Sequence, residues 1–341
     1  MKVTIPKKIP LMEDIGDGIF KIVLPQPFYA PNNIYIYEGN DGLIFIDSGY
    51  IESVPILQAS LRTKGYSLND IRHIIYTHNH LDHISSSLVL KSYARNLTYY
   101  GYRAMQDGVG NYLESMLLFE EATEDLFHKA FGDPEELNRI LLESRKGWRQ
   151  FFSKFKETKK GDPILRIDVA IDHNDSLELG GKSFRFLYTP GHNLYHITPV
   201  DPEHGIYFSG DLIIANLTAI YSEMDGSLGD YYFTLSKLLE EPIRRMLPAH
   251  GQEIDDPKKT ILVVRKTLSI LEKGVIRRLK EGESDLKVLM EAAIGKKVHN
   301  GGHLPTALGL VYSIIQKLVL EGQVRIERRE NGYEVFHYSG G

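Results

Sequence analysis

Short apolar runs bounded by turn residues dominate the first third of the chain. Residues 18–24, 34–37 and 43–46 are rich in isoleucine, tyrosine and phenylalanine, and the sequence Gly-Asn-Asp-Gly at 39–42 separates the last two runs. Aliphatic β-branched and aromatic residues favour strands, whereas Gly, Asn and Asp favour the turns between them. This pattern predicts a meander of antiparallel strands.

Further apolar runs have the same strand character but end at polar residues of the metal-ligand type. They occupy residues 73–76, 184–188, 205–208 and 246–247. A segment with helical spacing precedes the first of them, and another follows it. The mixture of strands and helices predicts an α/β (α+β) fold.

Residues 104–160 show apolar positions three and four apart and no strand signal, which predicts an α-helical insertion. The apolar positions form two stripes: Leu113, Met116 and Leu117, and then Trp148, Phe151, Phe152 and Phe155. Two interpretations stay open. The mixed charges favour an insertion packed on the core, and the alternative is a lid over a functional site.

The last part of the chain has its own pattern, and we place a domain boundary between domains 1–254 and 255–341. Three helical segments are followed by two β-rich runs around an Asn331-Gly332 turn. Helices followed by an Asn-Gly hairpin are typical of a winged helix. A dimerisation or supporting role is favoured over DNA reading, because a fold alone does not imply a function and the third helix lacks an arginine-rich surface.

Composition narrows the function classes. The 341 residues include no cysteine, so disulfides and thiolate metal ligands are excluded. The net charge is -5, yet residues 255–341 carry 15 basic and 11 acidic residues, so the main body is acidic and nucleic acid is disfavoured as a partner. The sequence has no apolar run of about 18 residues and no basic start before an apolar block. We therefore expect no membrane partner, no signal peptide and a cytoplasmic location.

Four potential metal ligands lie within six residues: His78, His80, Asp82 and His83. Neutral imidazoles and carboxylates are good ligands for Zn²⁺ and similar divalent ions. Burying four such groups without a metal would cost much free energy, so a loop whose histidines only cap the following helix is disfavoured. The cluster predicts a metal site.

Three more elements carry a candidate ligand directly after a predicted strand. They are Thr-Pro-Gly-His ending at His192, Ser-Gly-Asp ending at Asp211, and Pro-Ala-His-Gly around His250. Strands of one sheet bring such loops together at a single edge. We expect these side chains to converge on the histidine cluster.

The ordered motifs His-x-His-x-Asp-His, Thr-Pro-Gly-His, Gly-Asp and Pro-x-His-Gly resemble the metallo-β-lactamase superfamily over about residues 18–252. The resemblance implies an αββα sandwich with two divalent metal ions, with zinc favoured and iron or manganese as alternatives. It also implies one ion held by His78, His80 and His192, and a second held by Asp82, His83 and His250. Asp211 would bridge the ions, a carboxylate that true β-lactamases generally lack.

The resemblance also assigns roles around the ligands. Asp47 matches the family's Leu-Ile-Asp-Thr-Gly element and would orient a ligand histidine. Two ions about 3.5 to 4 Å apart would share a bridging hydroxide that attacks the substrate. Asp82 would accept or relay the proton of the attacking water.

Two further candidate catalytic residues follow His192. Many family members continue with Ser-Pro-Gly-His, whereas residues 193–196 read Asn-Leu-Tyr-His here. His196 keeps its place, and Tyr195 could reach the pocket, although a tyrosine packed at a helix start is the more common case. Ala249 replaces the more usual glycine before His250.

The leading hypothesis is a dinuclear metal-dependent hydrolase acting on a small-molecule carboxylic ester, thioester or lactone. An endoribonuclease or other phosphodiesterase is the first alternative, since two metals suit that chemistry as well. An iron-dependent redox protein of the same fold is the second, because the ligand types permit iron. A homodimer is left open.

Overall fold

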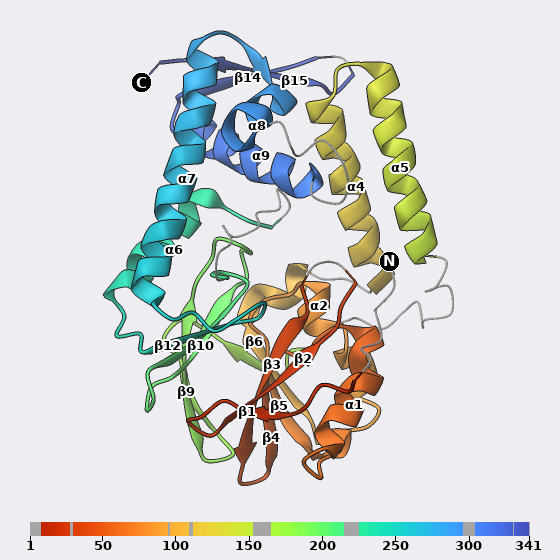
Figure 1. The fold of residues 1–341 in the computed structure, drawn as a ribbon, viewed down its shortest axis with the longest axis vertical. Helices are drawn as coiled ribbons and strands as arrows, with labels where there is room; N and C mark the ends of the chain where they lie inside the picture. Colours follow the sequence, from red (N-terminus) through yellow and green to blue (C-terminus); the bar gives the residue numbers. More distant parts are fainter. Residues whose placement is uncertain are drawn as a thin grey trace.

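The computed structural model describes residues 8–27, 30–94, 96–108, 112–152, 165–214, 225–295, 304–329 and 331–340. Two β-sheets form one end of the molecule, and long helices with a small third sheet form the other (Figure 1).

The first sheet has seven strands that lie side by side in chain order. They are β1 (Glu13–Asp14), β2 (Ile19–Leu24), β3 (Asn32–Gly39), β4 (Gly42–Ile46), β5 (Ile71–Ile75), β6 (Thr98–Tyr102) and β7 (Val169–Ile171). The first four pair antiparallel, which confirms the predicted meander, and β4 to β7 pair in parallel.

The second sheet has five strands in the order β12-β11-β10-β9-β8. They are β8 (Ser176–Leu179), β9 (Lys182–Tyr188), β10 (Ile197–Asp201), β11 (Ile206–Gly210) and β12 (Arg245–Pro248). The pairing of β11 with β12 is parallel, and the other pairings are antiparallel.

The two sheets pack face to face because residues alternate along their strands. On β3, Tyr35 and Tyr37 join a cluster between the sheets, whereas Ile34 and Ile36 join a cluster on the outer face of the first sheet. Helix α1 (Val54–Arg62) contributes to that outer cluster.

The remaining small helices of the sandwich are η1 (Ile51–Ser53), η2 (Leu68–Asp70), α2 (Leu81–Ile84), α3 (Ser87–Leu90) and η3 (Arg103–Gly108). Helix α6 (Leu228–Glu240) covers the outer face of the second sheet, where Tyr231 and Leu235 pack with Tyr207 and Met246. The layers are therefore α, β, β, α, and the predicted α/β class and αββα sandwich are confirmed.

Arg245 joins the edges of the two sheets. Its guanidinium donates two hydrogen bonds to Glu253, at 2.7 Å each, and one to Asp17 at 2.6 Å. We expect Arg245→Met to lower the free energy of unfolding by about 1–3 kcal/mol, because two carboxylates lose a charged donor. Urea unfolding measures this, with Arg244→Met as the control, since Arg244 is 54% exposed and should change the value by less than about 1 kcal/mol. Equal effects would contradict the assignment.

The C-terminal region combines three helices with a small sheet. Its elements are α7 (Pro257–Lys280), β13 (Ser284–Asp285), α8 (Leu286–Ile294), α9 (Leu304–Leu320), β14 (Val324–Arg328) and β15 (Glu334–Tyr338), with strand order β13-β15-β14. Asp256 and Asp285 cap α7 and α8 by accepting backbone hydrogen bonds. The winged-helix assignment and the boundary at 254/255 stay predictions.

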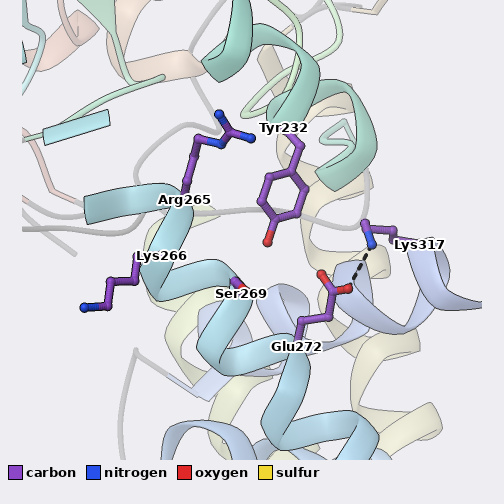
Figure 2. A pocket seen from close by; sticks show the side chains of 6 residues that line it. All are labelled: Tyr232, Arg265, Lys266, Ser269, Glu272 and Lys317. Carbon is purple, nitrogen blue, oxygen red and sulfur yellow. Dashed lines mark hydrogen bonds and ion pairs between the residues drawn. The ribbon is translucent and has the colours of Figure 1, made fainter. Parts of the chain in front are cut away.

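A polar cavity of about 510 Å³ lies where α6, α7 and α9 meet (Figure 2). Arg265 and Lys266 line it, together with Tyr232 and Lys317. Lys317 is already paired with Glu272, at 2.9 Å. None of the lining residues belongs to the predicted metal ligands.

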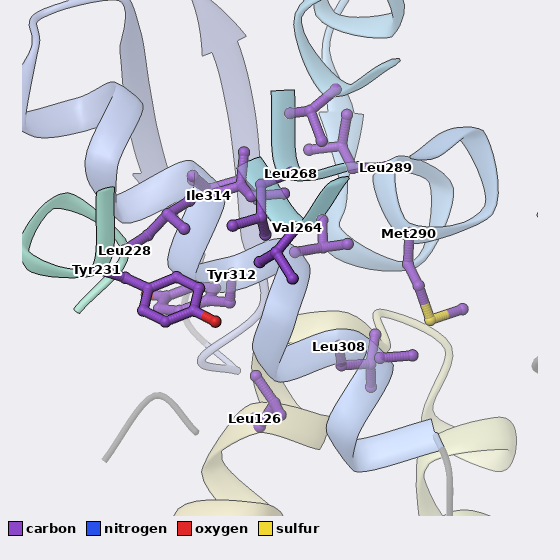
Figure 3. Packing of buried hydrophobic residues seen from close by; sticks show 14 of the residues in the cluster. Leu126, Leu228, Tyr231, Val264, Leu268, Leu289, Met290, Leu308, Tyr312 and Ile314 are labelled. Carbon is purple, nitrogen blue, oxygen red and sulfur yellow. The ribbon is translucent and has the colours of Figure 1, made fainter. Parts of the chain in front are cut away.

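The helical insertion packs on the C-terminal helices. It contains α4 (Tyr112–Ala130) and α5 (Pro134–Phe152). Leu126 of α4 lies in one apolar cluster with Leu289 and Met290 of α8 and Leu308 of α9 (Figure 3). The insertion therefore shares a core with residues from the predicted C-terminal domain.

The sequence pattern placed Leu113, Met116 and Leu117 on one apolar helix face, but Met116 and Leu117 differ in burial in α4. Met116 is buried against the sandwich cluster, whereas Leu117 is 40% exposed. The side chains of Leu113, Trp148, Phe151, Phe152 and Phe155 lie outside the described part. Within the described residues, no helix is both long and apolar enough to cross a membrane.

Candidate metal centre

Every predicted ligand lies in a segment that follows a strand of the sandwich. His78 and His80 follow β5, and the short helix α2 carries Asp82 and His83. Helix α2 lies at the end of the sandwich that faces the helical part of the molecule (Figure 1). The neighbouring strand ends bring the remaining ligands to the same place.

The first group contains His78, His80, His192 and Asp211, whose candidate ligand atoms all lie within 4.8 Å of one another. The Nδ1 atom of His80 is 3.1 Å from Nε2 of His192. The His78 ring centroid is 4.5 Å from that of His80. Three imidazoles and a carboxylate at this separation could hold one divalent ion.

The second group contains Asp82, His83 and His250, again within 4.8 Å. Oδ2 of Asp82 lies 3.4 Å from Nε2 of His250 and 3.6 Å from Nε2 of His83. The Nδ1 atom of His250 is 3.0 Å from the carbonyl oxygen of Pro31. A hydrogen bond there would direct Nε2 toward the other two side chains.

Asp211 lies between the two groups. Its Oδ1 atom is 3.2 Å from Nε2 of His250 and 3.5 Å from Nε2 of His83, and its Oδ2 atom is 3.9 Å from Nε2 of His192. Each carboxylate oxygen therefore faces a different group, which is the arrangement that a bridging ligand needs.

Two buried ring nitrogens of the centre have no hydrogen-bond partner among the described residues. They are Nε2 of His78 and Nε2 of His83. An unsatisfied polar atom in the interior costs free energy, and coordination to a cation would remove that cost. The residues present therefore fit divalent metal ions.

The charges of the centre are tightly coupled. Burial and the neighbouring His83 and His80 hold the pKa of His78 well below its usual value, so its imidazole is neutral. Burial alone would lower the pKa of His250, but the carboxylates of Asp211 and Asp82 together outweigh it and raise that pKa to about 10. Burial opposes the charge of Asp211, yet His250 and His83 hold its pKa well below the usual range. The centre thus keeps its carboxylates ionised.

Asp47 lies behind the second group. Its backbone has a positive φ of 61°, and its carboxylate accepts hydrogen bonds from the backbone NH (2.8 Å) and hydroxyl (2.9 Å) of Thr77. Oδ2 of Asp47 is 3.0 Å from Nδ1 of His83. This contact can fix the orientation of the His83 ring.

The two candidate residues after His192 differ in position. His196 is completely buried, with Nδ1 2.9 Å from Oγ1 of Thr189 and its ring 5.4 Å from that of His78. Tyr195 is partly buried against the cluster on the outer face of the first sheet. Neither belongs to the two ligand groups, and their catalytic roles stay predictions.

Three residues around the centre were not singled out from the sequence. Asn32 donates to Asp82 at 3.4 Å, Asn193 donates to Asn79 at 2.8 Å, and Asp225 lies 2.7 Å from His80. Nothing in the local sequence of Asn32 or Asp225 distinguishes it from an ordinary loop residue. Asn193 stood out only as a departure from the usual motif.

The candidate ligands, histidines and aspartates, lie together at the strand ends of a two-sheet sandwich. This arrangement defines a class of metal-binding folds. Residues 29–250 match the Metallo-beta-lactamase superfamily, and the chain belongs to this family.

Sequence similarity to other proteins supports this assignment. The chain is 32% identical over 109 residues to "Beta-lactamase-like protein 2 homolog" of Drosophila melanogaster, a match that covers 30% of this chain and 36% of the fly protein. It is 24% identical over 251 residues to "Probable metallo-hydrolase YqjP" of Bacillus subtilis (strain 168), covering 70% of this chain and 73% of that protein.

Solved structures are similar in fold to nearly the whole chain, and not only to its two-sheet sandwich. A beta-lactamase domain protein from Burkholderia ambifaria has a TM-score of 0.78 at 16% identity, covering 98% of this chain and 96% of that one. A metallo-beta-lactamase family protein from Thermus thermophilus has a TM-score of 0.73 at 18% identity, covering 95% of this chain and 100% of that one.

Proposed function

We propose that the protein is a dinuclear metal-dependent hydrolase that cleaves a small carboxylic ester, thioester or lactone. The observation that carries this proposal is the position of Asp211, whose two oxygens face two different groups of metal-ligand side chains. The similarity to a protein named a probable metallo-hydrolase supports hydrolysis as the reaction class.

The proposed ligands would be divided between two metal ions. His78, His80 and His192 would hold one ion, Asp82, His83 and His250 the other, and Asp211 both. Bound divalent ions, of which zinc is favoured, would supply a water-derived nucleophile near neutral pH and polarise the substrate carbonyl.

Substrate would approach from the side where the centre is open. The side chains of His80 and Asp82 are 23% and 13% exposed, whereas His78 and His83 are fully buried. We infer that Asp82, at the accessible side, accepts or relays the proton of a reacting water.

Helix α4 supplies an apolar surface that supports an acyl substrate. Leu117, Leu118 and Phe119 are 40%, 53% and 42% exposed, and the adjacent Met116 is buried in the same cluster as Met105. The carbonyl of Met105 accepts a hydrogen bond from Asn79 of the histidine loop, at 3.5 Å. We infer that this end of α4 borders the loop that carries the centre and that its exposed side chains contact an acyl chain.

A phosphodiesterase is the second candidate. Helix α7 carries eight Lys or Arg residues and one acidic residue, and Lys259, Lys266 and Lys273 are exposed on it. Such a surface favours phosphate contacts. The acidic main body weighs against it, so we rank it below ester hydrolysis.

The test is a substrate panel on protein of measured metal content. We expect hydrolysis of at least one carboxylic ester, thioester or lactone, removed by chelation and restored by Zn²⁺. We expect His80→Ala to lose it, whereas His128→Ala, a histidine of α4 outside both ligand groups, keeps it. Full activity in His80→Ala would refute the metal mechanism.

Cleavage of RNA with no ester hydrolysis would favour the phosphodiesterase, and oxygen uptake with bound iron would favour a redox protein.

A further inference from the structure

His80 has a different partner at each ring nitrogen. Nδ1 lies 3.1 Å from Nε2 of His192, within the first ligand group, and Nε2 lies 2.7 Å from Oδ2 of Asp225. A carboxylate at that distance accepts a hydrogen bond, so Nε2 carries the hydrogen and the Nδ1 lone pair is directed into the group. Asp225 therefore selects the tautomer of His80 that can bind a metal through Nδ1.

Asp225 also contacts the loop that carries His192. Its Oδ2 atom accepts a hydrogen bond from Nδ2 of Asn193 at 2.8 Å, and its backbone oxygen accepts one from the NH of Leu194 at 2.6 Å. Asn193 donates as well to Asn79, the neighbour of His80, at 2.8 Å. A single residue thus links the two loops that supply His80 and His192.

The second ligand group has a comparable carboxylate of its own. Asp47 lies 3.0 Å from Nδ1 of His83, on the far side of that ring from Asp82. Each group therefore has one histidine whose outward nitrogen faces a carboxylate. Asp47 was expected from its motif, whereas Asp225 comes from a segment 145 residues away from His80.

We propose that Asp225 is a positioning residue for the first ligand group, fixing the tautomer of His80 and holding the His80 and His192 loops together. This inference rests on the proposed metal-dependent function. Loss of Asp225 therefore weakens binding at the first group and leaves the second, which contains Asp82, His83 and His250, almost unchanged.

The experiment compares Asp225→Ala and Asp225→Asn with the wild type in stepwise Zn²⁺ binding by chelator competition. We expect Asp225→Ala to bind one of two Zn²⁺ ions about 10–100-fold more weakly, the usual effect of removing such a partner, and the other within about twofold. Asp225→Asn should lie between, because its amide oxygen still accepts from His80. Asp230→Asn is the matched control, since Asp230 is an exposed residue of α6 five positions away.

A second readout, also independent of activity, reports the tautomer of His80. Long-range ¹H–¹⁵N spectra should show His80 protonated at Nε2 in the Zn²⁺-loaded wild type. Equal weakening of both sites, or unchanged binding of both in Asp225→Ala, would overturn the proposal while leaving the proposed function standing. If Asp225→Ala does not fold, the Asp225→Asn variant decides the same question. A wild type that binds no divalent metal would refute the proposed function itself.

Discussion

Asp211→Asn is expected to lower hydrolysis about 1,000-fold and to reduce the metal content of the purified protein. The charged carboxylate faces both ligand groups, with 3.2 Å to His250 and 3.9 Å to His192. Metal-assisted stabilisation of a reacting carbonyl is worth several kcal/mol, and each ~1.4 kcal/mol is a factor of ten in rate. Metal analysis and kcat/KM for the substrate found in the panel measure both effects.

The control for this variant is Asp41→Asn. Asp41 directly precedes β4, whereas Asp47 follows that strand, so Asp41 lies at the opposite end of the sheet from the centre. Its carboxylate is 53% exposed and pairs with His73. Asp41→Asn should keep metal content and activity. Wild-type activity in Asp211→Asn would show that the two groups do not act as one centre.

Gly210→Ala is expected to destabilise the fold by about 2–5 kcal/mol. Gly210 has a φ of 50°, a conformation that costs an L-residue roughly 1–2 kcal/mol. A Cβ there would lie 2.6 Å from Nε2 of His196 and 2.8 Å from Oγ1 of Thr77, and overpacking of this kind adds roughly 1–3 kcal/mol. Since domains are stable by about 5–15 kcal/mol, the urea midpoint should fall clearly. Metal content should fall too, because Asp211 is the next residue.

Gly251→Ala separates the two contributions. Gly251 has a φ of 78° and follows the proposed ligand His250, but a Cβ there would meet no atom of the described residues within 4 Å. The variant should therefore lose only the roughly 1–2 kcal/mol of backbone strain. If Gly210→Ala were no more damaging than Gly251→Ala, the close packing of Thr77 and His196 on Gly210 would not matter for stability.

The strands that carry the ligands were predictable because their signals are local. The runs at 43–46 and 184–188 became parts of β4 and β9, and the run at 73–76 overlaps β5, which ends at Ile75. Aliphatic and aromatic residues in such runs can be buried on either face of a strand. The four ligand motifs were recognisable for the same reason, as each is a few residues long.

Other elements had no comparable signal. Strand β10 (Ile197–Asp201) begins directly after His196 and includes a proline, a residue that disfavours strands, so it was not predicted. The apolar positions in residues 104–160 predicted an apolar helix face, but they did not indicate which part of the protein packs against it. Only the tertiary structure shows that Phe127 of α4 and Phe131, which directly follows this helix, pack with the C-terminal helices.

The sequence by itself determined the donor chemistry of the centre: no thiolates, and histidines and aspartates placed just after strands. The family resemblance already implied which donors share an ion, and the tertiary structure decided the contacts that each donor makes. It brings His80 to His192 across 112 residues and to Asp225 across 145, and it turns the two oxygens of Asp211 toward different groups. These contacts depend on strand order and loop packing, which link residues far apart in the chain and leave no trace in any short segment of it.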